Sequence, residues 1–476
     1  MRDVKRKKIT RNHKKTNQKN AKKKVKSKIS SEMAEKYKYI PSKTTLEIER
    51  HRRELRRTRN SASFRIGNLI VNSAIKPWKV LLLPLSLVKL SWELASERLG
   101  WKNVPTHDSI ISSSNRDKKS ILVFPTNGVG FGHFTRILAV AKRIKKLDSE
   151  IEIIFFTTMT TLHILKEQGE FVAYHIPGRK KFKNMDAKTW NTLTEEFMEN
   201  IFAIHNPSLF IFDGAYPYRG MLNSIKNQEG LKKIWLRKGT LKKSFSKDPK
   251  ESINRFDYII RPKDSVEYDD ELDSDYIPDV VKCNPIIMLD KNELLSKKDA
   301  CARLGIPEKS KIVYVQLGAG NINNINSEIS ITIDILNKIE DLYIVIGESM
   351  IGKRMKIHGE KIRLIRDYPN SRFFNAFDFA IMAAGYNSFH EAIHFSLPSI
   401  FFPNLNTGQD NQLARAKVAE DIGAMIVVKD RKRQNIEDAI LKINNEKYRI
   451  KMKENIKKLH AENGAEQIAK YLIELI

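Results

Sequence analysis

From residue 120 onward, short runs of β-branched and aromatic residues alternate with stretches of helical periodicity. This alternation is typical of parallel sheets covered by helices on both faces, because two parallel strands need a crossover connection that a helix usually supplies. The runs fall into two series, so the chain is predicted to be an α/β protein with two doubly wound domains. The first series is Ile121–Pro125, Ile151–Phe156, Leu209–Phe212, Ile234–Leu236 and Tyr258–Ile260; the second is Ile312–Gln316, Leu342–Ile346, Ile362–Ile365, Phe379–Met382, Ser399–Phe402 and Met425–Val428.

The boundary between the two series falls at Cys283-Asn284-Pro285. We therefore expect an N-terminal domain over residues 117–285, a C-terminal domain over residues 286–462 and a terminal helix over residues 463–476. A length of 476 residues allows two or three domains. In open α/β sheets ligands bind outside the carboxyl ends of the strands, so the natural site is the cleft between the two domains. The apolar residues of the terminal helix recur at helical spacing: Ile468, Leu472 and Ile476.

Positive charge is concentrated at the N-terminus of a chain whose formal net charge is +29. Residues 1–30 hold fourteen lysines and arginines against one acid, Asp3. So little apolar content cannot offset the ordering entropy by burial, and residues 1–60 are predicted to form a basic, largely disordered tail. Such a tail suits anionic lipid or nucleic acid. The segment that follows favours lipid, with nucleic acid or no dedicated partner as the alternatives.

Residues 61–105 form an amphipathic segment whose apolar runs are short. The uncharged runs Ile66–Ile75 and Val80–Val88 fall short of the ~20 residues that a spanning helix needs, and Pro77 and Pro84 break a continuous helix. Tryptophans and lysines at the edges of the runs suit the plane of a membrane interface. The alternative is an ordinary helical pair packed on the next domain.

The compartment is expected to be reducing, because the only cysteines, Cys283 and Cys301, cannot form a disulfide framework. No apolar stretch follows the basic start closely, so no signal peptide is visible. We expect a cytoplasmic, peripheral protein on the inner face of the plasma membrane. The tail and residues 61–101 would contact its anionic surface.

A glycine-rich loop, Asn127 to Arg136, follows the first predicted strand. Glycines let backbone N–H groups approach an anion at a helix N-terminus. The acid that a nicotinamide site places at the end of the second strand is absent, which weakens that interpretation. A histidine beside the last glycine suits proton transfer from an acceptor hydroxyl, or binding of an acceptor phosphate, with a capped tight turn as the alternative. His133 is therefore predicted to be catalytic, and the predicted acceptor-binding or phosphate-binding residues are Gly130, Gly132, His133 and Arg136.

The C-terminal half carries three further motifs at predicted strand ends. The first is a second glycine loop. The next combines small residues with Glu391, whose two carboxylate oxygens suit two ribose hydroxyls. The third supplies an acid and amides that suit a sugar with several hydroxyls. The predicted donor-binding residues are Gly318, Ala319, Gly320, Asn321, Gly385, Asn387, Ser388, Glu391, Asp410, Asn411 and Gln412.

Two acidic or histidine-rich features allow more than one interpretation. Asp213 ends a predicted strand and is predicted to orient or deprotonate an acceptor, with a helix cap as the alternative. The stretch His390–His394 matches H-E-x-x-H, which places two imidazoles on one helical face for zinc. A catalytic zinc needs a third ligand, and only the distant Glu420 is at hand. A zinc hydrolase is therefore a minor alternative, and no metal site is predicted.

Together these ordered motifs resemble GT-B glycosyltransferases, especially the MurG-like family, over roughly residues 120–423. Gly128 to His133 is similar to that family's first glycine loop. Cys283-Asn284-Pro285 resembles the G-N-P that enters its second domain, with Cys in place of Gly. Gly318–Gly320 resembles its second glycine loop, and Gly385–Glu391 its donor signature, with Glu391 at the position of the ribose-binding acid. Asp410–Gln412 resembles its D-x-Q segment.

The resemblance implies two Rossmann-like halves, with the donor bound by the C-terminal half and the final helix returning to the N-terminal half. We expect inverting, metal-independent transfer of N-acetylglucosamine or another hexose from a UDP-sugar, which is a co-substrate rather than a cofactor. The acceptor would be a membrane-associated glycan or lipid-linked molecule of envelope, capsule or exopolysaccharide synthesis. The alternatives are an enzyme similar to UDP-N-acetylglucosamine 2-epimerase, and a non-catalytic membrane- or nucleic-acid-binding protein with a decayed donor site.

Overall fold

The structure is a computed structural model, and its contacts divide the chain into two units, Met1–Ile111 and Ser112–Ile476, which are described separately. Almost all of the predicted basic tail lies outside the described residues, as do Gly130, Ala319, Gly320 and Asn321. The residues that the structure describes are 55, 58–59, 61–75, 78, 80–98, 119–126, 131–226, 228, 230–237, 250–266, 278–318, 326–350, 354–407 and 410–476.

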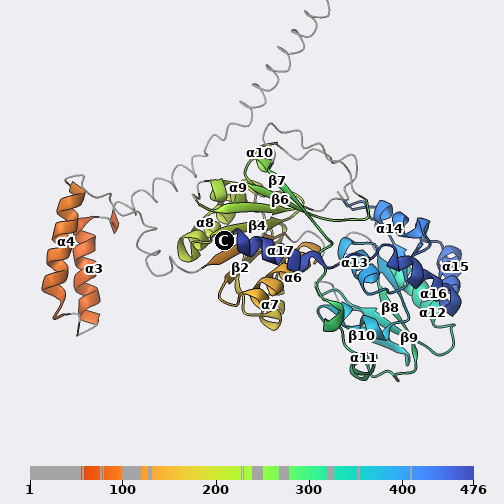
Figure 1. The fold of residues 1–476 in the computed structure, drawn as a ribbon. Coiled ribbons are helices and arrows are strands. Elements are labelled where there is room, and N and C mark those ends of the chain that lie inside the picture. Colours follow the sequence, from red (N-terminus) through yellow and green to blue (C-terminus); the bar gives the residue numbers. More distant parts are fainter. Residues whose placement is uncertain are drawn as a thin grey trace, which may run out of the picture. The chain divides into compact units, whose positions relative to one another are not determined.

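The described part of the first unit is a helical hairpin of α3 (Ala62–Ile75) and α4 (Leu83–Arg98), which lie side by side (Figure 1). Pro84 stands in the first turn of α4, where its missing N–H has no partner to lose, so it begins this helix rather than breaking one. Most apolar side chains of the hairpin are exposed. Within the described part of the chain, no helix has both the length and the apolar content needed to cross a membrane.

The N-terminal half of the second unit is built on a parallel sheet of seven strands in the order β3-β2-β1-β4-β5-β6-β7. The residues of β1 are buried throughout, as expected for a strand covered on both faces. The strands are β1 (Ser120–Pro125), β2 (Glu152–Thr157), β3 (Val172–His175), β4 (Leu209–Asp213), β5 (Lys232–Leu236), β6 (Tyr258–Pro262) and β7 (Asp279–Cys283). The helices of this half are α6 (Gly132–Leu147), α7 (His163–Gln168), η3 (Arg179–Lys181), α8 (Ala187–His205), α9 (Arg219–Lys226) and α10 (Lys250–Ile253).

The C-terminal half contains a second parallel sheet, of six strands in the order β10-β9-β8-β11-β12-β13. These strands are β8 (Lys311–Gln316), β9 (Leu342–Gly347), β10 (Ile362–Ile365), β11 (Phe379–Ala383), β12 (Ser399–Phe402) and β13 (Ile426–Val427). The helices here are η5 (Lys291–Glu293), α11 (Lys297–Leu304), α12 (Asn326–Leu336), η6 (Asn370–Ala376), α13 (Tyr386–His394), α14 (Gln412–Asp421), α15 (Arg433–Asn444) and α16 (Glu446–Lys457). Each half is thus a doubly wound α/β fold, as predicted.

The last helix, α17 (Gly464–Glu474), packs against α6 of the N-terminal half (Figure 1). Its buried side chains join the core cluster that also contains residues of β1 and α6. Gly464 permits the close approach at the start of the helix, because a Cβ there would lie 2.2 Å from the carbonyl oxygen of Asn284. The predicted return of the final helix to the N-terminal half is confirmed.

All eleven predicted strands are present, and each observed bound lies within two residues of the predicted one. Two strands were missed, β3 and β7. Both lie at an edge of the first sheet and are only partly buried, so neither carries a continuous apolar run.

Candidate active site

The strand order of the first sheet reverses between β1 and β4, the point at which doubly wound folds bind ligands. The loop after β1 leads into α6, which carries His133 in its first turn. Asp213 is the last residue of β4 and lies in register with Pro125, the last residue of β1. The topology therefore brings His133 and Asp213 to the same edge of the sheet.

His133 and Asp213 are directly hydrogen-bonded, with 2.6 Å between Nδ1 of the imidazole and Oδ1 of the carboxylate. An ionised carboxylate only accepts hydrogen bonds, so Nδ1 carries the proton and the lone pair is left on Nε2. This is the tautomer that a general base needs. The His133 side chain is 21% exposed, whereas that of Asp213 is fully buried.

Arg136, one turn further along α6, holds the other side of Asp213. Its Nε donates to Oδ2 at 3.0 Å and its Nη2 to Oδ1 at 2.5 Å. Burial alone would raise the pKa of Asp213, but Arg136 and then His133 bring it below its ordinary value, so the carboxylate stays ionised. Arg136 is itself buried. The structure thus places Arg136 on Asp213, and the predicted contact with an acceptor phosphate gains no support from this position.

The second sheet reverses its order between β8 and β11. Gly318 follows β8 with φ +104°, a left-handed conformation that favours glycine. After β11, Gly385 is the N-cap residue of α13, and no side chain caps this helix. The first-turn N–H groups of α13 therefore have no side-chain acceptor at the N-cap, and these groups suit an anion.

Glu391 lies on α13 and is partly buried. Its Oε1 accepts a hydrogen bond from Oγ of Ser371 in η6, at 3.0 Å. Burial raises the pKa of Glu391 to about 7, and the single hydroxyl donor offsets this only in part. The carboxyl group therefore titrates near neutral pH.

Asn387 reaches from α13 to the first glycine loop of the other half. Its Nδ2 donates to the carbonyl oxygen of Gly132 at 3.4 Å, and its buried Oδ1 has no partner among the described residues. Ser388 lies beside it in the first turn of the same helix. The predicted donor motif and the predicted acceptor loop are therefore in contact.

The three residues of the predicted D-x-Q segment have different surroundings. Asp410 is bound to Arg415 at 2.7 Å. Asn411 caps α14, where its side chain accepts from the N–H of Ala414. Gln412 accepts from the N–H of Asn404 and is mostly buried. Asn411 and Gln412 thus shape the loop through bonds of their own, and Asp410 is the member held by a charged side chain.

The two histidines of the H-E-x-x-H stretch have separate partners. Nε2 of His390 lies 3.2 Å from Oδ1 of Asp264, and Nδ1 of His394 lies 3.4 Å from the carbonyl oxygen of Ala461. Oε1 of Glu420 accepts from the N–H of Val427. Across the described ranges, no cluster of three or more His, Cys, Asp or Glu side chains is arranged to hold a metal ion. Each of these two histidines therefore contacts a group within the protein.

Sequence reasoning missed three residues at the meeting point of the halves: Asp264, Tyr386 and Arg415. Asp264 follows β6 and is 3% exposed, and it binds the fully buried Arg415 of α14. Tyr386 lies next to them at the start of α13. A strand-end acid was the one available signal, because Asp264 comes shortly after the predicted strand Tyr258–Ile260 and Asp213 directly after the predicted strand Leu209–Phe212.

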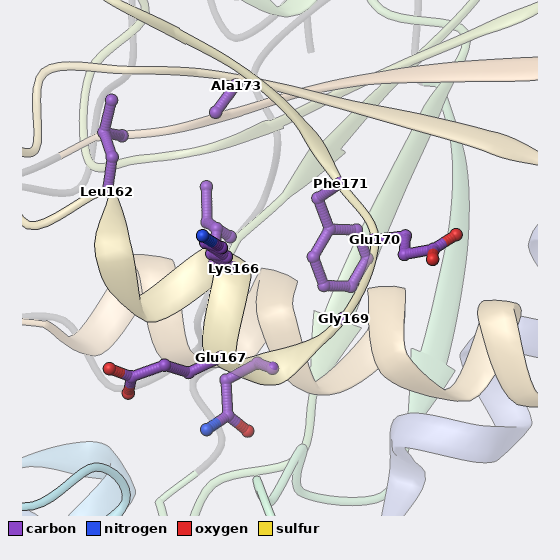
Figure 2. Close-up of a pocket in the computed structure, with 9 residues that line it drawn as sticks. Leu162, Lys166, Glu167, Gly169, Glu170, Phe171 and Ala173 are labelled. Carbon is purple, nitrogen blue, oxygen red and sulfur yellow. The ribbon is translucent and has the colours of Figure 1, made fainter.

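A cavity of about 670 Å³ lies beside α7 and the chain that leads into β3. Figure 2 shows Leu162, Lys166 and Glu167 on one side of it and Phe171 and Ala173 on the other. None of the predicted site residues lines this cavity. This cavity is therefore separate from the strand-end residues at the two switch points.

Comparison with known proteins agrees with this geometry. Residues 360–471 match the glycosyltransferase family 28 C-terminal domain, a stretch that contains α13 and α14. Two curated relatives are UDP-N-acetylglucosamine–N-acetylmuramyl-(pentapeptide) pyrophosphoryl-undecaprenol N-acetylglucosamine transferases. The Aquifex aeolicus protein is 27% identical over 207 residues, which cover 42% of this chain and 58% of that relative. The Acetivibrio thermocellus protein is 25% identical over 328 residues, which cover 64% of this chain and 84% of that relative.

The fold also matches a solved structure of this family. Acinetobacter baumannii MurG superposes with a TM-score of 0.51 at 13% identity, covering 75% of this chain and 99% of MurG. At that identity the likeness shows the two-domain GT-B architecture and nothing finer. The matched C-terminal domain, the two curated relatives and this architecture together support a MurG-like glycosyltransferase of family 28 type with a GT-B fold.

Proposed function

We propose that this chain transfers a sugar, N-acetylglucosamine or another hexose, from a UDP-sugar to a membrane-associated glycan or lipid-linked acceptor. The observation that carries the proposal is the His133–Asp213 pair at the switch point of the N-terminal half, 2.6 Å apart and fixed by Arg136. The donor motifs on the matched family 28 domain contact the same loop through Asn387. The contact between the proposed donor motif and the loop that carries the proposed base supports transfer between them.

In the proposed reaction an acceptor hydroxyl oxygen attacks the anomeric carbon of the donor from the face opposite UDP. The hydroxyl proton passes to Nε2 of His133, and Asp213 stabilises the imidazolium that forms. The bond from the anomeric carbon to the diphosphate oxygen breaks, and UDP leaves with the electron pair, so the configuration is inverted. Backbone N–H groups at the start of α13 and in the Gly318 loop would stabilise the charge that grows on UDP. No metal ion is required, and activity is expected to persist in EDTA.

The experiment is a thermal-shift titration with UDP, ADP, GDP and NAD, followed by product analysis. A ligand that binds only the folded state raises the unfolding midpoint by mass action, so UDP alone is expected to raise it. Release of UDP from a UDP-sugar should then require an acceptor. Conversion of the sugar without any acceptor would instead indicate an epimerase. An unchanged midpoint with all four nucleotides would contradict the proposed donor site.

We also propose that the described hairpin, α3 and α4, lies in the interface of an anionic membrane. A stripe of exposed apolar side chains follows one face of the second helix: Leu85, Val88 and Trp92, which are 69–70% exposed. Apolar residues at this spacing share one helical face. A stripe so exposed is unusual for a surface in contact only with water, and the basic residues 1–60 supply charge complementary to anionic lipid.

A further inference from the structure

Arg415 is a fully buried cation shared by two carboxylates. Its Nε donates to Asp264 Oδ1 at 2.8 Å, and its Nη2 donates both to Asp264 Oδ2 and to Asp410 Oδ1 at 2.7 Å. Its Nη1 donates to the carbonyl oxygen of Ala384, in the turn before α13, at 3.0 Å. One guanidinium thus joins two of the three donor motifs of the C-terminal half to an acid of the N-terminal half.

Both carboxylate oxygens of Asp264 take part in this arrangement. Besides Arg415, its Oδ1 accepts from the backbone N–H of Ser265 at 2.8 Å and from Nε2 of His390 at 3.2 Å. Burial would raise its pKa, but Arg415 and His390 bring the pKa far below its ordinary value. Oγ of Ser265 also donates to the backbone carbonyl of Arg415 at 3.0 Å. The N-terminal half therefore fixes both the side chain and the backbone of Arg415.

Tyr386 lies between this cluster and the proposed catalytic residues. Its ring centroid is 5.8 Å from the guanidinium carbon of Arg415 and 5.2 Å from that of Arg136, which holds Asp213. Its hydroxyl donates to the carbonyl oxygen of Lys263 and accepts from the N–H of Ile286. The two buried arginines therefore contact the same aromatic ring, one from the catalytic pair and one from the donor motifs.

We infer that Arg415 is a positioning residue for the donor sugar, which fixes the carboxylate of Asp410 in the donor site and is itself fixed by Asp264 of the N-terminal half. The inference rests on the proposed role of Asp410 in donor binding. It adds that a residue of the acceptor half completes the donor site, so the affinity for the sugar depends on how the two halves are docked.

Electrostatics gives the reason for such an arrangement. An unpaired carboxylate beside the donor would repel the negatively charged diphosphate, and this repulsion is large where water is excluded. Pairing with Arg415, which is shared with Asp264, offsets part of the charge on Asp410 and leaves it able to accept hydrogen bonds from sugar hydroxyls. The side chain of Arg415 is itself fully buried. Its two carboxylate partners together offset the cost of removing this cation from water.

The test is a double-mutant cycle on ligand affinity in the full chain. Dissociation constants of UDP-N-acetylglucosamine and UDP are measured by calorimetry for the native protein, Arg415→Lys, Asp410→Asn and the double variant. The native protein should bind the UDP-sugar more tightly than UDP. Each single variant should reduce that preference about tenfold, an effect of the size that interactions within one hydrogen-bond network commonly have. The affinity for UDP itself should be nearly unchanged. The double variant should lose little more than Asp410→Asn does.

Arg143→Lys provides a matched control. Arg143 is 3% exposed, and its Nη2 likewise bridges two carboxylates, Asp290 and Glu293, at 2.8 and 2.7 Å. This variant removes a buried two-carboxylate bridge but should leave the preference for the sugar unchanged. Asp264→Asn, which keeps the size of the side chain, should reduce the preference as Arg415→Lys does, and should raise the donor KM more than it lowers kcat.

The outcomes separate the inference from the proposed function. If neither the native chain nor any variant binds UDP, the proposed function fails. If the native chain binds UDP but Arg415→Lys keeps its preference for the sugar, the positioning role is overturned. Additive losses from Arg415→Lys and Asp410→Asn, an equal loss in Arg143→Lys, or equal native affinity for the two ligands would overturn it as well.

Discussion

His133 and Asp213 form the pair on which the proposed chemistry depends, and substitution of His133 is the direct test. His133→Ala is expected to lower kcat by about 10²- to 10⁴-fold, the usual contribution of a general base. The donor KM and the unfolding midpoint should change little, because the side chain is partly exposed and Asp213 keeps its bonds to Arg136. Steady-state kinetics with a UDP-sugar measure this. The control is His163→Ala, an exposed histidine on α7; equal activity of the two variants would remove His133 from the mechanism.

Glu391 links donor binding to pH. Only the ionised carboxylate accepts hydrogen bonds from two ribose hydroxyls, and burial raises the pKa of this group to about 7. The donor KM should therefore fall as the pH rises through about 7 and level off above it. In Glu391→Gln the KM should be higher at pH ~8 and nearly independent of pH. A variant that keeps the native pH profile would show that another group controls donor binding.

The same shift predicts an opposite effect on stability. The native state retains a proton that the unfolded chain releases, because the pKa of Glu391 rises from its ordinary value of 4.5 to about 7 on folding. The free energy of unfolding should therefore decrease as the pH rises from 4.5 to about 7. Glu391→Gln removes this penalty, so its unfolding midpoint should exceed the native one at pH ~8 and match it near pH ~4. Thermal scans at both pH values measure the difference.

Among elements, the central strands were predictable, whereas the two edge strands of the first sheet, β3 and β7, were missed. Strands such as β1 are buried on both faces and read as continuous apolar runs, and the motifs that follow them located His133, Asp213 and Glu391. The contact between Asp264 and Arg415 was beyond such reasoning, since 151 residues separate them and only the docking of the two halves brings them together. Arginine side chains are usually exposed, and no local sequence pattern indicates that Arg415 is buried.

The hairpin makes a prediction at the level of an element. Replacing Leu85 and Val88, each 70% exposed on α4, with glutamate should release the protein from vesicles that contain anionic lipid, because charge on this face opposes insertion. The fold should be unaffected, since neither side chain is buried. Leu441→Glu combined with Ile450→Glu changes two exposed apolar residues of the other unit and serves as the control. Vesicle co-sedimentation measures binding, and unchanged binding by the hairpin variant would sink the membrane proposal.

At the scale of the whole molecule, α17 packs into the core of the N-terminal half, although in sequence it follows the C-terminal half. Leu472 is 1% exposed and packs in the cluster formed by α6 and β1. Leu472→Ala should lower the free energy of unfolding by about 2–5 kcal/mol, the usual cost of truncating a buried leucine. Leu441→Ala, on an exposed face of α15, should change it little.

This connection predicts how the second unit unfolds. Because α17 follows the C-terminal half in sequence and packs on the N-terminal half, we expect the two halves to unfold together. Leu472→Ala should therefore lower the midpoint of both halves together, in one transition. Denaturant unfolding followed separately at Trp235, which is buried in the N-terminal half, and at Tyr314, in the C-terminal half, measures this coupling. Two transitions, with only the one at Trp235 shifted by the substitution, would show that the halves unfold independently and that α17 is a local contact.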